Sequence, residues 1–377
     1  MHEPFERPVA PLLAQVLGRA TAPSALATST IRHPRLDVAL AKLQEALASP
    51  ADHRNVLLVG PAGTGKTKVL SLLRAWLDEV LAPAMIADLS IRPVVVLSAP
   101  AASGGTFSWL RFGGRILEAL EAPALEWATA PSLASAPAAS LHRVRGMKPD
   151  DVLAMAEEEC RLRKVQVIVV DEAGHLAVVA RSPHAREQLD VLKDFSQRTG
   201  VRFLLAGTYD LLAFRDASAQ LARRTRVVHL RRYREGDARD ELAFAQIARE
   251  MLALVEGGVP GETEGLLTEL FAGSLGCAGV LRDWLVDAEA LHRNQNGRAS
   301  FTACLRDTRK DDGQLQAMRD ELVLEEVAER PTRPAAVAPP IVVPRPRNAP
   351  RTASGQVLLP GELKPRRRPL GDPHVSA

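Results

Sequence analysis

Short, largely apolar runs alternate along the chain with longer segments in which apolar residues recur every third or fourth position. The runs of strand length are 56–59, 93–98, 165–170, 201–206 and 227–230. They show no polar alternation, which indicates strands buried on both faces rather than half-exposed ones. Strands of this kind that alternate with helices are typical of a parallel sheet. The pattern therefore predicts an α/β fold with a five-stranded parallel sheet and helices on both faces.

The helical spacing places amphipathic helices before, between and beyond the apolar runs. One is expected before the first run, at 35–47, and those between the runs at 69–81, 106–120, 150–164 (with Asp150 as its cap), 184–198 and, in part, 212–224. Helices at 237–255, 263–272 and 280–292 follow the last run with no strand between them. We therefore expect a small all-α lid behind the α/β unit.

Changes in composition divide the chain into five expected parts. These are an arm rich in Pro and Ala (1–30), an α/β core (31–235), an α-helical lid (236–295), charged C-terminal helices (296–330) and a tail (331–377). The tail has eleven prolines and no aromatic residue, so we expect it to be disordered. The stretch 122–148 is rich in Ala and Pro and predicts a surface loop whose role stays open.

The sharpest chemical motif is the segment Gly60-Pro61-Ala62-Gly63-Thr64-Gly65-Lys66-Thr67. It fits G-x-x-x-x-G-K-[ST] and lies between a predicted strand and a predicted helix. Its glycines let backbone N–H groups close around phosphates at the positive end of the helix. Lys66 can reach the β- and γ-phosphates, and the Thr67 hydroxyl can ligate Mg²⁺. The motif predicts binding of ATP with Mg²⁺.

Two acids follow the third apolar run, at the expected carboxyl edge of the sheet. Asp171 would hold the metal through water, and Glu172 would orient and polarise the attacking water. A base at this place favours hydrolysis over phosphoryl transfer to a second substrate, which makes a small-molecule kinase the less favoured alternative.

Other candidate residues lie farther along the chain. Thr208 follows the fourth run and could contact the γ-phosphate or the water, although alone it suits a helix cap. Arg224, ahead of Arg223, precedes the fifth run and could reach a neighbouring subunit's phosphates; the alternative is a solvated basic turn. Arg282 opens a lid helix and could fold over the γ-phosphate, with a surface arginine as the alternative.

In this order, these elements resemble the AAA+ ATPases, and within them the TniB/TnsC family of transposition regulators. The similarity covers about residues 30–295. The segments that carry it are Ile31-Arg32-His33-Pro34-Arg35, the phosphate loop, 94–100, 170–176, 206–210 and the two arginines before 227–233.

The resemblance implies an ATP-dependent DNA-binding ATPase with the AAA+ P-loop NTPase fold. Such proteins assemble as rings or helical filaments on duplex DNA and link a target-site selector to a DDE transposase. By motif match, the resemblance assigns phosphate and Mg²⁺ binding to Lys66 and Thr67, and the Walker B roles to Asp171 and Glu172. It assigns sensor 1 to Thr208, the arginine finger to Arg224 and sensor 2 to Arg282. It places Ile31, Pro34 and Arg35 near the adenine.

Contacts with DNA are harder to assign. In this fold the loops after the second strand and before the third line the pore of a ring, so basic residues there are candidates. They are Arg111, Arg115, Arg143, Arg145 and Lys148. One or two phosphate contacts per subunit, repeated along an assembly, would hold DNA without base readout. For each of them a solvated charge is the alternative.

The formal net charge of +3 conceals an uneven distribution. The tail from Pro331 carries eight basic and two acidic residues, a net +6, whereas residues 1–330 carry 40 basic and 43 acidic residues, a net −3. DNA contact by the body must therefore come from a few basic residues. The tail suits a tether for DNA or a protein partner.

Cysteine use and hydropathy indicate the compartment. Cys160, Cys277 and Cys304 lie far apart without metal-ligand spacing, so we expect small core residues in a reducing cytoplasm. No apolar run is long enough to span a membrane, and the N-terminus lacks the pattern of a signal peptide.

Two further functions stay open. A AAA+ replication initiator or helicase loader would share the fold, but residues 298–377 show no winged-helix pattern. A nucleotide-dependent adaptor switch would have the same nucleotide site but would hydrolyse little ATP.

Overall fold

The computed structural model of the chain describes residues 24–50, 54–102, 106–121, 146–180, 185–256, 263–295 and 298–329. Most of the predicted arm, nearly all of the predicted loop at 122–148 and the whole predicted tail lie outside these residues. The chain divides into one compact unit over 1–329 and a second over 330–377, and the described residues all belong to the first.

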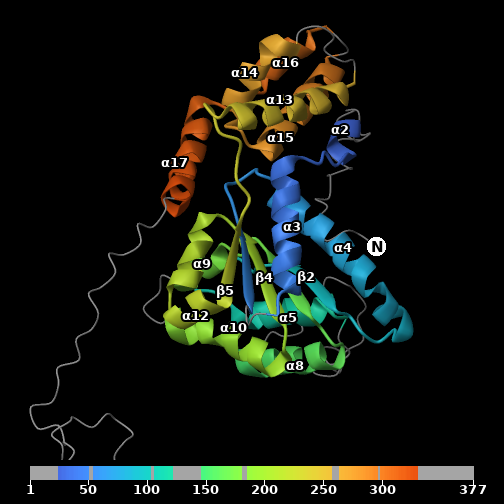
Figure 1. Cartoon of the computed structure of the whole chain (residues 1–377), viewed down its shortest axis with the longest axis vertical. Coiled ribbons are helices and arrows are strands. Elements are labelled where there is room, and N and C mark those ends of the chain that lie inside the picture. The colour runs from blue at the N-terminus through green and yellow to red at the C-terminus, as the bar shows by residue number, and fades with distance from the viewer. Residues whose placement is uncertain are drawn as a thin grey trace, which may run out of the picture. The chain divides into compact units, whose positions relative to one another are not determined.

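The sheet has the five parallel strands that the apolar runs predict (Figure 1). The strands are β1 (Asn55–Val59), β2 (Val94–Ser98), β3 (Val167–Asp171), β4 (Arg202–Gly207) and β5 (Thr225–His229), in the order β2-β3-β4-β1-β5. In the register, Val59 lies opposite Gly207 on β4 and His229 on β5, and Val170 on β3 lies opposite Leu205. The carboxyl ends of β1, β3 and β4 therefore meet at one edge.

Helices cover both faces of the sheet, as predicted. Alternate strand residues separate two cores: Leu57 and Val59 point to one face, and Val56 and Leu58 to the other. The first face is covered by α5 (Trp109–Ala119), α8 (Pro149–Leu162), α9 (His175–Ala180), α10 (Ala185–Thr199), α11 (Leu212–Asp216) and α12 (Ala219–Arg224). The second face is covered by α3 (Pro34–Ala48) and α4 (Lys66–Ala87).

A third core belongs to the helices that follow the sheet. They are α13 (Ala238–Ala253), α14 (Thr263–Ser274), α15 (Ala278–Asn294), α16 (Phe301–Asp307) and α17 (Asp312–Glu329). Leu26 of the short helix α2 (Ala25–Thr28), from the segment predicted as an arm, packs in this core together with Phe301 and Leu305 of α16. The Trp284 indole N–H donates to the Leu305 carbonyl over 2.8 Å. The helical layer thus also uses chain segments from outside the 236–295 range.

One predicted helix start is wrong. Lys148, not Asp150, is the N-cap of α8, and it makes no side-chain capping bond. Pro149 takes the first helical position, where its fixed φ and missing N–H cost nothing. Asp150 and Asp151 therefore fall in the first turn, where their charges interact favourably with the helix dipole.

The three cysteines are buried, as predicted for core residues. Among the described helices, none combines the length and the apolar character that crossing a bilayer requires.

A buried histidine links α3 to the segment between β5 and α13. The Leu36 N–H donates to His33 Nδ1 over 3.3 Å, so Nδ1 carries no proton and accepts from the Tyr233 hydroxyl 2.9 Å away. His33 is buried. The pKa of His33 is lowered to about 4, chiefly by burial; the Asp37 charge opposes the shift and the Arg35 charge adds to it. His33 is therefore neutral in the folded protein at pH 7.

This depressed pKa predicts a loss of stability in mild acid. Above pH 6.5 His33 is neutral in both folded and unfolded chains and contributes no pH dependence. As the pH falls from 6.5 to about 4 only the unfolded chain gains this proton, which lowers the free energy of unfolding by about 3 kcal/mol. Urea unfolding at pH 7.5, 6 and 5 measures the slope.

The matched variant is His33→Asn, since asparagine is also a good N-cap but does not titrate. We expect a shallower loss of stability over this pH range in His33→Asn than in the parent chain. Equal slopes in the two proteins would contradict the assignment.

Candidate nucleotide-binding site

The loop 60–67 joins the end of β1 to the start of α4. Gly63 and Gly65 have φ values of 73° and 96°, a left-handed backbone that glycine adopts without strain. The Thr64 hydroxyl donates to the Pro61 carbonyl over 2.9 Å and closes the turn. Gly65 is the N-cap of α4, so the predicted start at 69 is three residues late. The loop therefore lies at the positive end of a long helix.

Lys66 reaches back across this loop. Its ammonium donates to the carbonyls of Gly60 and Pro61 over 2.7 and 2.8 Å. Burial lowers the pKa of Lys66, and the nearby charges of Glu321, Asp171 and Cys277 oppose that shift. The amine that the sequence assigns to phosphates thus lies at the mouth of the loop.

The two predicted metal ligands are in direct contact. The Thr67 hydroxyl donates to Asp171 Oδ2 over 2.9 Å, and Asp171 is buried. Mg²⁺ is commonly held by one carboxylate, a hydroxyl, water and substrate phosphates, so this oxygen pair fits it. Among the described residues no group of three or more His, Cys, Asp and Glu side chains could hold a metal ion by itself. Nucleotide phosphates would have to complete the coordination.

Glu172 adopts an unusual backbone beside this pair. Its φ is 55°, which is uncommon outside glycine. Its N–H donates to Asp171 Oδ1 over 2.8 Å, so both Asp171 oxygens are engaged. The Glu172 side chain is exposed, directly after β3 at the carboxyl edge of the sheet.

Thr208 is brought to the same edge by β4. The Gly60 N–H donates to the carbonyl of Gly207, the residue before Thr208, over 3.3 Å. Thr208 starts the short 3₁₀ turn η2 (Tyr209–Leu211) without a side-chain capping bond. Loop, acids and threonine thus meet where three neighbouring strands end.

The helical layer lies directly on the loop. The backbone N–H groups of Gly279 and Val280, at the start of α15, donate to the Gly63 carbonyl over 2.8 and 3.2 Å. A Cβ added at Gly279 would lie 2.5 Å from that carbonyl oxygen. The sequence places Gly279 directly before the predicted lid helix at 280–292. Only the structure shows that it contacts Gly63 of the loop.

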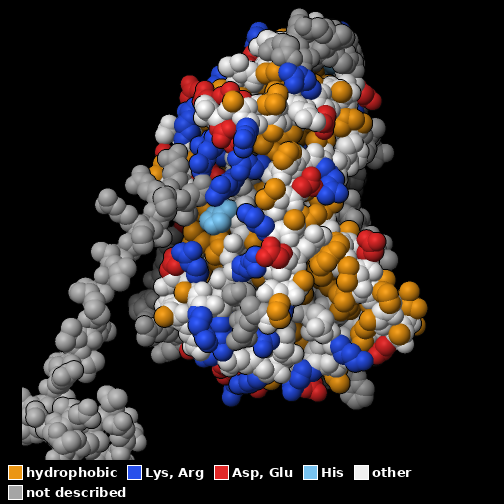
Figure 2. All heavy atoms as spheres, viewed as in Figure 1, with side chains coloured by type: hydrophobic (Ala, Val, Ile, Leu, Met, Phe, Trp, Pro, Cys, Tyr) orange, Lys and Arg blue, Asp and Glu red, His pale blue; other side chains and the backbone are white. Residues whose placement is uncertain are grey.

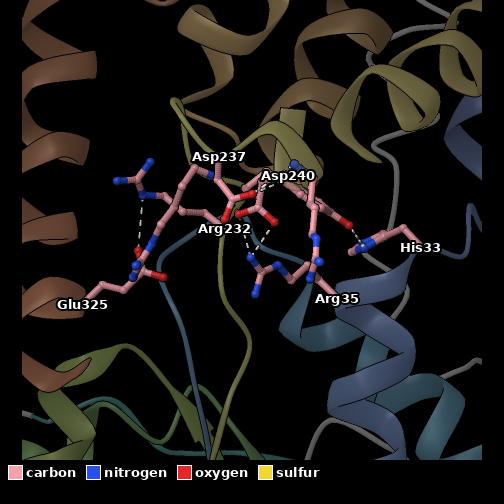
Figure 3. Close-up of polar contacts among 9 residues, drawn as sticks. His33, Arg35, Arg232, Asp237, Asp240 and Glu325 are labelled. Atoms are coloured by element: carbon pink, nitrogen blue, oxygen red, sulfur yellow. Dashed lines mark hydrogen bonds and ion pairs between the residues drawn. The ribbon is translucent and has the colours of Figure 1, made fainter. Parts of the chain in front are cut away.

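Of the three predicted adenine-side residues, Arg35 belongs to a polar cluster that joins α3 to α13 (Figure 3). Arg35 binds both carboxylate oxygens of Asp240 over 2.6 Å and lies 5.7 Å from the centre of the Tyr233 ring. Ile31 packs against the helical core, and Pro34 is the exposed first residue of α3. The structure thus uses Arg35 to hold the two layers together.

The candidate arginines lie in different places. Arg282 donates to the Ala27 carbonyl of α2 over 2.5 Å. The exposed Arg223 and the half-buried Arg224 end α12, directly before Thr225, which pairs with Asn55 at the amino end of β1. They lie at the sheet edge opposite the phosphate loop.

Of the DNA candidates, Arg111 and Lys148 are exposed. Arg115 of α5 donates to the carbonyl of Ser98, at the end of β2. Arg143 and Arg145 lie outside the described residues.

Sequence reasoning missed one residue at the loop. The Ala62 N–H donates to Glu321 Oε1 of α17 over 3.0 Å, between residues 259 positions apart in the chain. No local pattern marks Glu321, because it is one of several acids on a charged helix.

Residues 51–214 match the family model described as an AAA domain. Comparison with curated proteins finds no match. Together with the five-stranded parallel sheet and the helices around it, the family match shows an AAA+ P-loop NTPase fold.

Several solved structures are similar to the chain. The Walker-type ATPase PABY2304 of Pyrococcus abyssi has 17% identity and a TM-score of 0.46, over 79% of this chain and 75% of that one. The ORC2 protein of Aeropyrum pernix has 16% identity and a TM-score of 0.47, over 75% and 70%. Domain III of the Thermotoga maritima replication initiation protein DnaA has 15% identity and a TM-score of 0.41, over 75% and 95%.

The contact between Gly63 and α15 predicts the effect of a single methyl group. Gly279→Ala should push α15 off the loop and lower the free energy of unfolding by about 1–3 kcal/mol, because the new Cβ meets backbone. Urea unfolding of the full chain measures this.

Gly265→Ala is the matched control, since a Cβ at this helical position meets nothing within 4 Å. It should be neutral or stabilising by up to about 1 kcal/mol. Equal stability of the two variants would show that α15 does not press on Gly63.

Proposed function

We propose that this chain is an ATPase that assembles on duplex DNA under the control of ATP and links a chosen target site to recruitment and activation of a DDE transposase. The observation that carries the ATPase part is the Thr67–Asp171 hydrogen bond at the mouth of the phosphate loop. The transposition part is supported by the resemblance of 31–35, 170–176 and 206–210 to the TniB/TnsC family.

The residues suggest how hydrolysis would proceed. Loop N–H groups bind the phosphates, and Lys66 exchanges the Gly60 and Pro61 carbonyls for phosphate oxygens. Mg²⁺, held by Thr67 and Asp171, would supply charge neutralisation at the phosphates. Glu172 would accept the proton of the water that attacks the γ-phosphorus, and Thr208 would position that water.

A second subunit would complete the site. Arg224 lies at the sheet edge away from the phosphate loop of its own chain, as the register of β5 with β1 requires. A guanidinium at this place is suited to a neighbour's γ-phosphate, with Arg223 as its alternate. We assign Arg282 as sensor 2, which requires it to exchange the Ala27 carbonyl for phosphate.

DNA contact is proposed along α5 and the start of α8. Arg111 and Lys148 expose their charges, and Arg115 lies on the same helix as Arg111. Arg143 and Arg145, which precede α8 in sequence, belong to the same proposal. Figure 2 shows that Lys and Arg side chains are interspersed with Asp and Glu on the face in view, so repetition along an assembly would have to supply the affinity.

The first test is hydrolysis. Lys66→Ala should abolish binding of ATP, whereas Lys68→Ala, two residues further along α4, should not. Glu172→Gln should keep ATP binding and lower the hydrolysis rate about 10²–10⁴-fold, because it removes the proton acceptor. Phosphate release and titration with a fluorescent ATP analogue measure the two steps.

A Glu172→Gln chain that hydrolyses ATP at the parent rate would remove Glu172 from its role. Slow turnover in the parent with strong ATP-dependent partner binding would instead favour the adaptor switch.

The second test is assembly. With ATP and duplex DNA, Glu172→Gln should form stable rings or filaments that microscopy and sedimentation detect, and Lys66→Ala should not. Binding should weaken as salt rises and should not depend on DNA sequence. A chain that stays monomeric with ATP and DNA would contradict the proposal, and sequence-specific binding to an origin would favour a replication initiator.

A further inference from the structure

The phosphate loop already binds a carboxylate of its own chain. Glu321 Oε1 accepts the Ala62 N–H over 3.0 Å, inside the segment that the motif assigns to phosphate. A backbone N–H of the loop thus binds one carboxylate from α17.

The helix that carries Glu321 is fixed against the protein. Leu315 and Leu322 are buried, and Glu325 is fully buried. Glu325 Oε2 accepts from Arg232 Nε over 3.2 Å (Figure 3). Residues 321 and 325 lie one turn apart on the same face of α17, so the pair with Arg232 also orients Glu321. α17 also packs against η2, next to Thr208.

A carboxylate and a phosphate compete for a backbone N–H of the phosphate loop. Both are anionic acceptors, and a loop at a helix N-terminus binds either. The two cannot accept the same N–H at once. Their mutual repulsion adds to this exclusion.

We propose that Glu321 is an internal competitor of the nucleotide, which makes α17 an autoinhibitory element of the ATPase. The inference rests on the proposed nucleotide binding. ATP binds only after the Glu321 carboxylate has left the Ala62 N–H. The apparent affinity for ATP is then the intrinsic affinity reduced by the fraction of chains in which α17 has moved.

The linkage is reciprocal. A partner that binds α17 in its displaced position raises the affinity for ATP, and ATP raises the affinity for that partner by the same factor.

The test compares Glu321→Ala with Asp320→Ala in the full chain. Both changes replace an acid by alanine on α17, but Asp320 is exposed and accepts from Gln316 on the same helix. A fluorescent ATP analogue with Mg²⁺ is titrated into each. Glu321→Ala should bind about tenfold tighter than the parent chain, the size expected for a hydrogen bond to a charged group. Asp320→Ala should bind like the parent.

Equal affinity of the parent and Glu321→Ala would overturn the autoinhibition while leaving the proposed function standing. If no variant binds the analogue, and Lys66→Ala behaves like the rest, the proposed function fails and the inference with it.

Amide hydrogen exchange of α17 gives a second readout that does not depend on affinity. In the parent chain the ATP analogue should speed exchange in 312–325, and in Glu321→Ala exchange should be fast without it. Asp320→Ala should follow the parent. Exchange that stays unchanged or slows with the analogue in the parent chain would overturn the displacement of α17.

Discussion

The site depends on the parallel pairing of β1 with β4 and of β4 with β3. Because all three strands run the same way and in register, their carboxyl ends lie at one edge. The loop after β1, the acids after β3 and the threonine after β4 then meet without any long side chain having to reach across the sheet. Crevices at the carboxyl ends of such sheets are where α/β proteins bind their ligands.

The start of α15 contacts this edge through backbone hydrogen bonds. The Gly63 carbonyl accepts two N–H groups from the start of α15, and the two glycines involved leave no room for a Cβ. Farther away, Arg35 pairs with the buried Asp240, and His33 with Tyr233. Losing Arg35 would leave the Asp240 carboxylate uncompensated, which is costly in a buried position. Any movement of the helical layer relative to the sheet must therefore break or rearrange these contacts.

The sheet, its covering helices and the core of the nucleotide site were predictable from sequence because their signals are local. An apolar run marks each strand, and the spacing in 60–67 places Lys66 and Thr67 by itself. Asp171 followed because strand ends share an edge. The start of α8 was predicted wrongly because the preference of Pro149 for the first helical position prevailed over the capping tendency of Asp150.

Contacts between distant segments carry no such signal. The bond from Ala62 to Glu321 spans 259 residues, and Glu321 is one acid among several on α17. Arg282 shows the same limit: its place on α15 follows from helical spacing, but its bond to Ala27 depends on where α2 packs. Only the packing of the helical layer decides which of many charges meets the loop.

The packing of the helical layer also determines which hydrogen bonds must break before a nucleotide can bind. In this structure the Ala62 N–H is paired with Glu321, and the Lys66 ammonium with two carbonyls of its own loop. The Ala62–Glu321 bond is exposed and the Lys66 bonds are partly buried, so each of these groups has a protein or water partner before a nucleotide binds. A nucleotide therefore does not add hydrogen bonds to open donors. It exchanges one set for another, and its affinity is the difference between the two sets. Small changes in the protein's own acceptors consequently have large effects on that difference, and α17 supplies the one acceptor that is charged.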